Sequence, residues 1–337
     1  MSVHASAREL AERPSRPVRA ALHDAVEAAV LAPSIRNTQP WLFRLHDGRV
    51  DVLGDRRRRL PAADPHGIGL RMSCGAALFN LRLGIARLGF EPETTILPDP
   101  AEPTVLATVV AGREQRASPT EAALYDAIPR RRSNHHPFLG RPVPLPVRTA
   151  VREAAEAEGC WLDFLVGPAA VAMAAQLVRS AEHVLNREEA YLTELIRWPH
   201  PSTDQAELVA GDGDPVVGVL GTDGDLPYHD VMAGQALQRM LLTTTMAGLA
   251  ASLFFQPIEV TPAREELRAG LRRRGWPSML VRAGYGVPAP PTPRRELREV
   301  VIMARTAVKS ARWPLPPGRG CRSAKRRACP PLRCCRP

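Results

Sequence analysis

Three adjacent polar residues in the middle of the chain have types and spacing suited to binding phosphate. Arg131, Arg132 and Ser133 lie within the segment IPRRRSNHHPF, residues 128–138. A planar guanidinium group can hold two phosphate oxygens at once, and a serine hydroxyl can donate a further hydrogen bond in the same cradle. The alternative is a solvated basic run, residues 130–132, before a proline-rich loop. On these residues alone, both interpretations stay open.

A second segment, APSIRNTQPW at residues 32–41, combines small residues with amide side chains. Pro33 and Ser34 permit close approach of a flat ligand to the backbone. The amide groups of Asn37 and Gln39 can hydrogen-bond to the polar edge of such a ligand. The alternative is a helix C-terminus followed by a turn that a proline stops.

Apolar residues at helical spacing mark a third segment, residues 233–259. The pattern predicts a long, almost fully buried helix with Gly248 near its end, followed by a short extended piece. Its most apolar part, residues 241–255, contains three threonines and is shorter than the roughly 20 residues that a bilayer core requires. We therefore expect a buried helix here and no membrane span.

Together the three segments resemble the nitroreductase family of flavoproteins. The resemblance implies that the first half of the chain contacts the flavin ring of FMN and that the Arg-Arg-Ser element holds the FMN phosphate. It also implies that a Pro-Ile-Glu turn brings its backbone to flavin N5, the atom that receives and passes on hydride. His135 stands where many relatives carry a second Arg or Lys. The residues assigned to the cofactor in this way are Pro33, Ser34, Asn37, Gln39, Arg131, Arg132, Ser133, His135, Pro257, Ile258, Glu259, Arg294 and Arg295.

The order of the segments resembles the Acg-type branch of that family, in which two half-modules in one chain mimic the usual homodimer. The strings DPxGxxL at residues 64–70 and SCGAAL at residues 73–78 are shared with that branch. An internal comparison supports a duplication, because aligning Gly75 with Gly234 also aligns four further identical pairs at the same offset. We predict an α+β nitroreductase fold with half-modules at residues 1–126 and 127–306, each an antiparallel sheet packed with helices. Only one complete FMN site is expected.

Composition limits the partners of the folded body. The chain of 337 residues has a formal net charge of +10, with 45 basic and 35 acidic residues. Ten of the basic residues follow Glu299, where no acidic residue occurs, so the body is formally neutral. The Arg-, Pro- and Cys-rich tail, residues 307–337, is predicted to be disordered. We expect no specific nucleic-acid partner and no membrane partner. The cysteine and histidine spacing predicts no metal site.

The resemblance implies an FMN-dependent oxidoreductase that passes hydride from NAD(P)H to a small-molecule electron acceptor such as a nitroaromatic or a quinone. No side chain is expected to act as a catalytic acid or base, because FMN performs the redox chemistry. No Walker motif or Rossmann fingerprint is present. The absence of an apolar leader predicts a cytoplasmic protein, either a monomeric pseudo-dimer or a weak homo-oligomer. The alternative is a non-catalytic protein that binds or sequesters FMN. The short segment 198–214, where relatives can carry a lid over the flavin, favours turnover.

Overall fold

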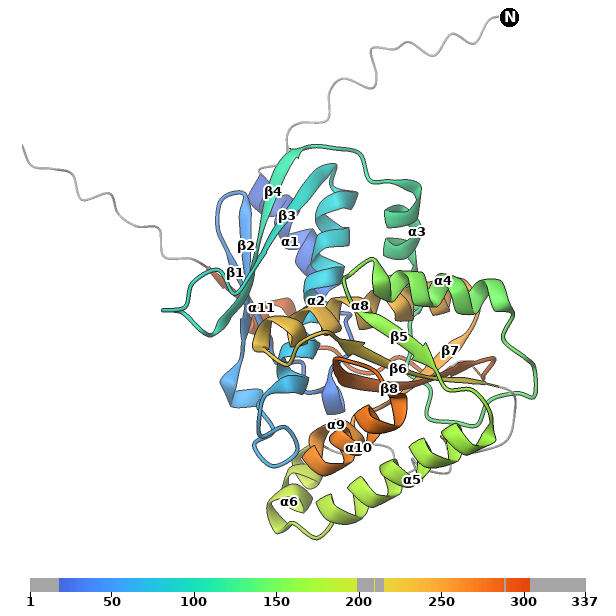
Figure 1. Ribbon diagram of the computed structural model, residues 1–337. Coiled ribbons are helices and arrows are strands. Elements are labelled where there is room, and N and C mark those ends of the chain that lie inside the picture. Colours follow the sequence, from blue (N-terminus) through green and yellow to red (C-terminus); the bar gives the residue numbers. More distant parts are fainter. Residues whose placement is uncertain (1–17, 199–208, 210–214, 288, 304–337) are drawn as a thin grey trace, which may run out of the picture. The chain divides into compact units, whose positions relative to one another are not determined.

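The computed structural model describes residues 18–198, 209, 215–287 and 289–303 (Figure 1). The predicted tail and all but two residues of the segment 198–214 lie outside the described residues. These described residues belong to one compact unit.

The first half of the chain folds into strands packed on two helices. The 3₁₀ helices η1 and η2 lie in its connecting segments. Its elements are α1 (Val18–Ala29), η1 (Ile35–Asn37), β1 (Trp41–Leu45), β2 (Arg49–Gly54), η2 (Arg56–Arg58), α2 (Ile68–Arg87), β3 (Phe90–Ile96), β4 (Val105–Glu114), α3 (Pro119–Ala127) and η3 (Ile128–Arg130).

The second half has a similar sequence of elements, with additional helices between its strands. These are α4 (Leu145–Glu156), β5 (Trp161–Phe164), α5 (Pro168–Leu185), α6 (Glu189–Arg197), β6 (Val216–Thr222), α8 (Pro227–Met246), β7 (Ala250–Phe254), α9 (Gln256–Glu259), α10 (Thr261–Leu271), β8 (Trp276–Gly284), α11 (Leu297–Val300) and β9 (Val301–Met303).

The two sheets repeat one topology. The first has the strand order β3-β4-β2-β1, and the second has the order β7-β8-β6-β5. All neighbouring strands within these two sets are antiparallel. Matching strands therefore occupy matching positions, which agrees with the predicted pair of tandem half-modules. The short strand β9, from the end of the second half, pairs in parallel with β1 and completes the first sheet, so the second half contributes a strand to the sheet of the first half.

Helices α2 and α8 form the main contact between the modules, and each also packs on its own sheet. Both helices are buried almost all round, as expected for a helix with apolar or small residues on every side. They cross where Gly75 and Gly234 face each other. A Cβ on Gly75 would lie 2.2 Å from the Val231 carbonyl oxygen, and one on Gly234 would lie 2.1 Å from the Met72 carbonyl oxygen.

This crossing has the reciprocity of a two-fold axis. Met72 and Val231 differ by the same sequence offset as Gly75 and Gly234. Each glycine therefore approaches the carbonyl group of the residue three positions before the other glycine. Arg71 and Asp230 share that offset as well, and they form an ion pair of 2.7 Å across the interface. The alignment found in the sequence thus reappears as a pseudo-symmetric contact in space.

The third sequence segment is divided more finely than predicted. Helix α8 ends at Met246, and Gly248 follows with a φ of +72°, a conformation that glycine adopts without strain. Residues 250–254 form strand β7, and the Pro-Ile-Glu residues belong to the one-turn helix α9 instead of a turn. Within the described residues, no helix is long and apolar enough to cross a membrane.

Candidate functional site

A cavity of about 340 Å³ lies among elements of both modules. The first half contributes η1 with its flanking loop and α2. The second half contributes the Arg-Arg-Ser segment, α8, β7, α9, β8 and the loop before α11. Its lining residues are Pro33, Ser34, Ile35, Arg36, Asn37, Met72, Ser73, Ala76, Arg131, Arg132, Ser133, His135, Leu237, Leu253, Phe255, Gln256, Glu259, Met279, Pro290, Thr292, Pro293 and Arg294.

Three arginines give the cavity a strongly basic region. Arg131 is 3% exposed. Burial, followed by the charges of Arg294 and Arg132, lowers its pKa to about 9. Burial and the charge of Arg132 likewise lower the pKa of Arg294 to about 10. Among the described residues, no carboxylate forms an ion pair with any of the three. Three neighbouring cations without an acidic partner create a site for an anion.

The Ser133 hydroxyl belongs to the same region. Arg131 Nη1 donates a weak hydrogen bond to Ser133 Oγ at 3.4 Å, while Arg131 Nε is buried without a partner. The backbone of Ser133 also forms a parallel bridge with Ala251 at the start of β7. This contact fixes the Arg-Arg-Ser segment against the second sheet.

The loop from Pro33 to Gln39 faces these arginines from the first module. Arg36, Asn37 and Gln39 all have positive φ, between 48° and 53°, a conformation that costs free energy for residues with a Cβ and is concentrated at functional sites. The loop is held by specific bonds. Ser34 Oγ accepts from the Gln39 backbone N–H at 2.9 Å, and Arg294 Nη1 donates to Asn37 Oδ1 at 3.2 Å.

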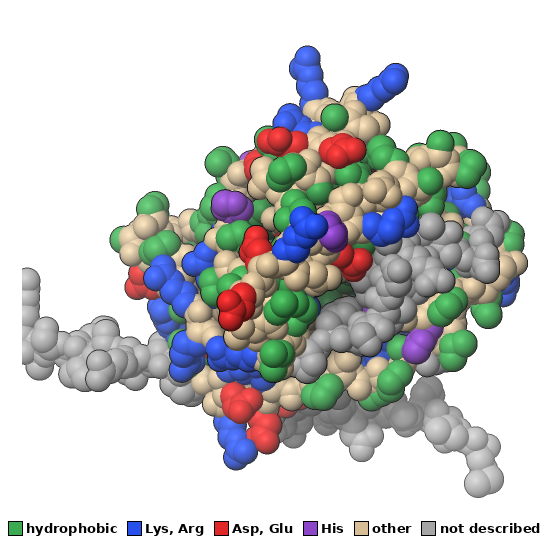
Figure 2. Space-filling model, turned by 90° about the horizontal axis from the view of Figure 1, so that it is seen from below, with side chains coloured by type: hydrophobic (Ala, Val, Ile, Leu, Met, Phe, Trp, Pro, Cys, Tyr) green, Lys and Arg blue, Asp and Glu red, His purple; other side chains and the backbone are tan. Residues whose placement is uncertain are grey.

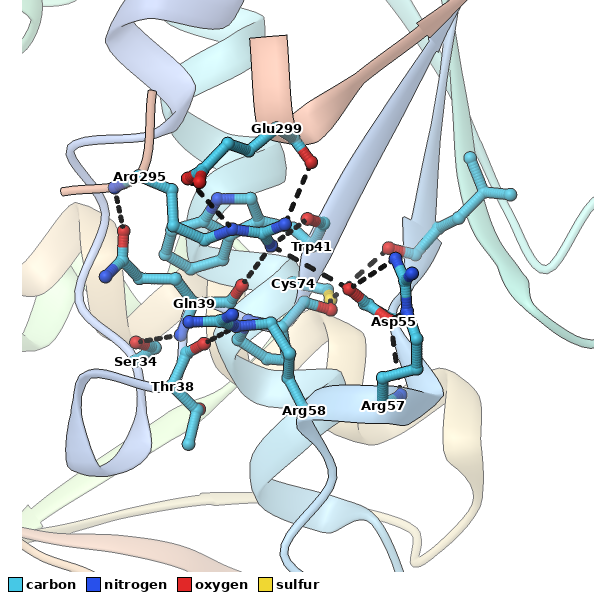
Figure 3. A network of polar contacts seen from close by, with 12 residues as sticks. Ser34, Thr38, Gln39, Trp41, Asp55, Arg57, Arg58, Cys74, Arg295 and Glu299 are labelled. Atoms are coloured by element: carbon cyan, nitrogen blue, oxygen red, sulfur yellow. Dashed lines mark hydrogen bonds and ion pairs between the residues drawn. The ribbon is translucent and has the colours of Figure 1, made fainter. Parts of the chain in front are cut away.

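Behind the loop, Gln39 and Arg295 form a bracing network (Figure 3). The Arg295 backbone N–H donates to Gln39 Oε1 at 2.7 Å, and its guanidinium donates to the carbonyl oxygens of Gln39, Trp41 and Glu299 at 2.8–3.3 Å. The carboxylate of Asp55 lies 3.9 Å from the same guanidinium. Both side chains are thus engaged in holding the strained loop, and neither lines the cavity.

A separate acidic group lies where α9 meets the cavity. Burial raises the pKa of Glu259 to about 8, although the Arg36 charge lowers it. Glu259 Oε2 and Gln256 Oε1 are buried without hydrogen-bond partners. Arg36 itself donates to the Tyr191 hydroxyl on α6.

The cavity brings together nine of the thirteen residues proposed for the cofactor. The nine are Pro33, Ser34, Asn37, Arg131, Arg132, Ser133, His135, Glu259 and Arg294. Pro257 and Ile258 are buried beneath the wall in α9, and Gln39 and Arg295 lie in the bracing network. The role of each of these residues toward a cofactor stays a prediction.

Sequence reasoning missed the apolar walls of the cavity. Met72 and Ala76 on α2, and Leu237 on α8, line it together with Leu253 and Phe255. Their signal in the sequence is the same as that of core residues, because both kinds of position are apolar and repeat with the helical period. Ser73 belongs to the SCGAAL string at residues 73–78. It accepts a hydrogen bond from the Ile35 N–H at 3.2 Å and so attaches the loop to α2.

The remaining surface offers few competing sites. On the face shown in Figure 2, basic side chains lie among acidic and hydrophobic ones and do not merge into one basic surface within the coloured, described part. In that part of the chain, one group of three potential metal ligands occurs, His23, Asp24 and Glu27 on α1. It does not line the cavity.

The residues of the cavity fit FMN in charge and in polarity. The unpaired arginines suit its phosphate, and apolar side chains suit the faces of its ring. Four buried polar atoms of lining side chains, Nε of Arg131 and Arg294, Oε1 of Gln256 and Oε2 of Glu259, have no partner within the described residues. Buried polar atoms without partners are rare in folded proteins, and a bound ligand or water usually satisfies them.

Comparison with known proteins identifies relatives among the nitroreductases. No protein-family model matches the chain. A Mycobacterium tuberculosis protein with the provisional name NAD(P)H nitroreductase Rv3131 is 32% identical over 311 residues, covering 81% of this chain and 88% of its own length. A second protein of that organism, provisionally named NAD(P)H nitroreductase acg, is 28% identical over 313 residues, covering 83% of this chain and 94% of its own length.

Two solved structures with detectable similarity each match about half of the chain. An iodotyrosine deiodinase bound to FMN and 3-iodo-L-tyrosine is 17% identical, with a TM-score of 0.42, and covers 51% of this chain and 95% of its own. The FMN-dependent nitroreductase NfnB of Mycobacterium smegmatis, in complex with NADPH, is 18% identical with a TM-score of 0.40. The match covers 55% of this chain and 99% of NfnB. On the sequence relationship to Rv3131, which spans most of both chains, this protein belongs to the NAD(P)H nitroreductase family.

Proposed function

We propose that this protein is an FMN-dependent oxidoreductase that takes hydride from NAD(P)H and passes it to an electron-poor small molecule of the nitroaromatic or quinone class. The observation that carries the proposal is the cluster of Arg131, Arg132 and Arg294 without acidic partners, at a cavity that also has apolar walls. An anionic group joined to a flat apolar body satisfies both features. FMN has both, and the family relationship makes it the preferred ligand.

The residues of the cavity divide into two tasks. Arg131, Arg132, Ser133 and Arg294 would hold the phosphate through charge-assisted hydrogen bonds. The strained loop would present the Asn37 amide to the polar part of the ring system, and its rigid bracing would keep that amide in place without further ordering on binding. When bound, FMN supplies hydride acceptance and donation at N5.

The apolar walls contribute orientation and exclusion of water. Met72, Ala76 and Leu237 come from the two crossing helices, which the Gly75–Gly234 contact holds at close distance. Such walls cannot move far without opening the core of the protein. They would leave room for a nicotinamide ring or an acceptor, one at a time, beside the cofactor.

We infer a single site for each chain, because the ring-facing loop belongs to the first half and the basic cluster to the second. We also propose that the chain acts as a monomeric pseudo-dimer, since the α2–α8 crossing supplies the contact between modules. Light scattering of the purified protein tests this point, and a mass of two or more chains contradicts it.

The test of function is the visible spectrum of the purified protein before and after anaerobic addition of NADPH or NADH. Flavin absorbance that bleaches, and returns when a quinone is added, supports the oxidoreductase. Flavin absorbance that persists with both donors contradicts turnover and favours the alternative of an FMN-sequestering protein. A protein that neither contains nor takes up FMN refutes both.

A further inference from the structure

One acidic side chain of the cavity takes no part in the binding scheme above. Glu259 lies on the one-turn helix α9, and its Oε2 is buried with no hydrogen-bond partner among the described residues. A carboxyl group in such a place is costly to ionise, because burial removes the water that would stabilise its charge. Its proton is therefore held more tightly than that of an ordinary glutamic acid.

Glu259 also lies on the wall between two hollows. It lines the main cavity, and it lines a second, more open hollow formed by residues of the 61–65 loop, the end of α5, the segment before α6 and α6 itself. Glu188 and Glu194 are on the wall of that second hollow. No other side chain is shared by the two hollows among their lining residues.

The electrostatic neighbours of Glu259 differ from those of the basic cluster. The charges that shift its pKa are those of Arg36, Asp64 and Glu194, whereas those that shift the pKa of Arg131 are Arg294 and Arg132. Helices α5 and α10 and strand β8 pack on α9, but the charged groups that shift the pKa of Glu259 come from outside these three elements. Burial, followed by the charge of Glu259, raises the pKa of Tyr191 on α6 to about 12.

We propose that Glu259 is the proton donor to the electron acceptor, and that water in the second hollow returns the proton to it. This inference rests on the proposed function. Reduction of a quinone to a hydroquinone requires two electrons and two protons. Hydride from the reduced cofactor supplies two electrons and one proton, and the Glu259 carboxyl supplies the other proton to the quinone oxygen. The carboxylate that remains takes a proton from water.

The proposal fixes the direction in which the rate of acceptor reduction changes with pH. Glu259 donates only in its protonated form, and burial raises its pKa to about 8. The carboxyl group is therefore mostly protonated at pH 7. The rate of acceptor reduction should fall as pH rises through about 8, and it should be independent of pH well below that value.

The decisive variant is Glu259→Gln, which keeps the shape of the side chain and removes the proton. Glu266→Gln, on the exposed face of α10, makes the same chemical change outside both hollows. Holoenzyme reduced by one equivalent of NADPH is mixed anaerobically with tetramethyl-1,4-benzoquinone, and the return of flavin absorbance is followed. We expect Glu259→Gln to slow quinone reduction about 100-fold at pH 7, the usual scale for loss of a general acid, and to abolish the fall above pH 8.

Two further steps should not respond to this variant. Reduction of bound FMN by NADPH delivers hydride to the cofactor and needs no proton from Glu259. Reoxidation by ferricyanide removes electrons without protonating the acceptor. Equal rates for Glu259→Gln and the wild type in these steps support the proposal. A loss of similar size in all three steps would show general damage to the cavity and overturn it.

A readout without turnover completes the test. Cofactor-free protein labelled with carbon-13 at the glutamate carboxyl carbons is titrated by NMR, and the spectrum of Glu259→Gln identifies the signal of Glu259. A midpoint near pH 8 supports the proposal, and a midpoint near the ordinary value for glutamate contradicts it.

The two proposals fail in different ways. A wild-type protein without reducible FMN refutes the proposed function and, with it, this inference. A wild-type protein that turns over, with Glu259→Gln and Glu266→Gln equally fast on the quinone at every pH, refutes only the role of Glu259.

Discussion

Replacement of Arg131 by alanine separates phosphate binding from general stability more clearly than any other change in the cavity. The side chain is buried beside Arg132 and Arg294, and its one hydrogen bond within the described residues is the long contact to Ser133 Oγ. In the FMN complex it would gain a charge-assisted bond to phosphate, and such bonds contribute about 1.5–3 kcal/mol. We therefore expect Arg131→Ala to raise the Kd for FMN about 10-fold to about 150-fold.

The cofactor-free protein should respond differently. An unpaired buried cation next to two others opposes folding, so its removal relieves repulsion and desolvation, while loss of its aliphatic stem removes some packing. We expect these effects to offset each other closely, and the melting temperature of the apoprotein to stay the same or rise. This combination of weaker binding and unchanged stability is the signature of a ligand-directed charge.

The assay is titration of apoprotein with FMN and with riboflavin, followed by quenching of flavin fluorescence. Riboflavin lacks the phosphate, so Arg131→Ala should change its Kd little. Arg130→Ala, one residue earlier at the exposed end of η3, is the matched control and should leave both ligands unaffected. Equal losses for FMN and riboflavin, or an apoprotein that unfolds, would refute the assignment of Arg131 to the phosphate.

Three further predictions concern the helix crossing, the number of sites and the buried acid. Gly75→Ala places a Cβ 2.2 Å from the Val231 carbonyl oxygen and should destabilise the protein by about 3 kcal/mol; Gly140→Ala, where the space around the glycine is open, should not, and denaturant unfolding compares them. The purified holoprotein should contain one FMN for each chain, and a ratio of two by absorbance would contradict the shared site. Burial raises the pKa of Glu259 from 4.5 to about 8, so the contribution of its neutral form to stability is fully present below pH 4.5 and is lost as pH rises through about 8. At about 1.4 kcal/mol for each pKa unit, the free energy of unfolding of Glu259→Gln apoprotein should exceed that of the wild type by up to about 5 kcal/mol above pH 8 and by nothing near pH 4. Equal pH profiles of melting temperature for the two proteins would disprove the shift.

The buried helices and the internal repeat were predictable because their signals are local or periodic, whereas the fold was predicted from the resemblance to the nitroreductase family. Apolar and small residues at helical spacing predict the buried helices, and the glycines that follow these helices occur at the same offset in both halves. Gly89 and Gly248 both have positive φ directly after α2 and α8, so the repeat in sequence corresponds to a repeated helix ending. The addition of β9 to the first sheet had no comparable signal, because three residues form β9 and its partner strand β1 lies more than 250 residues away.

Which polar residues line the cavity and which brace the loop was not predictable either, because the bracing contact joins residues far apart in the sequence. Gln39 and Arg295 have the residue types of a cofactor site, and their positions beside Asn37 and Arg294 suggested that role. In the structure they bond to each other across a separation of 256 residues. A polar side chain beside a site can contact the ligand or support the residue that does, and the sequence does not distinguish these two cases.

The pseudo-symmetry gives a physical reason for the single site that we propose. A symmetric pair of modules creates two equivalent positions at the α2–α8 interface, each bordered by a loop of one module and a strand of the other. The strained loop with its amide side chains occurs only in the first half, and the Arg-Arg-Ser segment only in the second. In a homodimer every substitution changes both sites, whereas in one chain each half can change independently. One position can then keep the ligand-directed charge while the other becomes packed core, and the second module is free to acquire helices such as α5 and α6. It is on α6 that Tyr191 and Glu194 reach the surroundings of Glu259, so the proposed proton route depends on an element that the first module lacks.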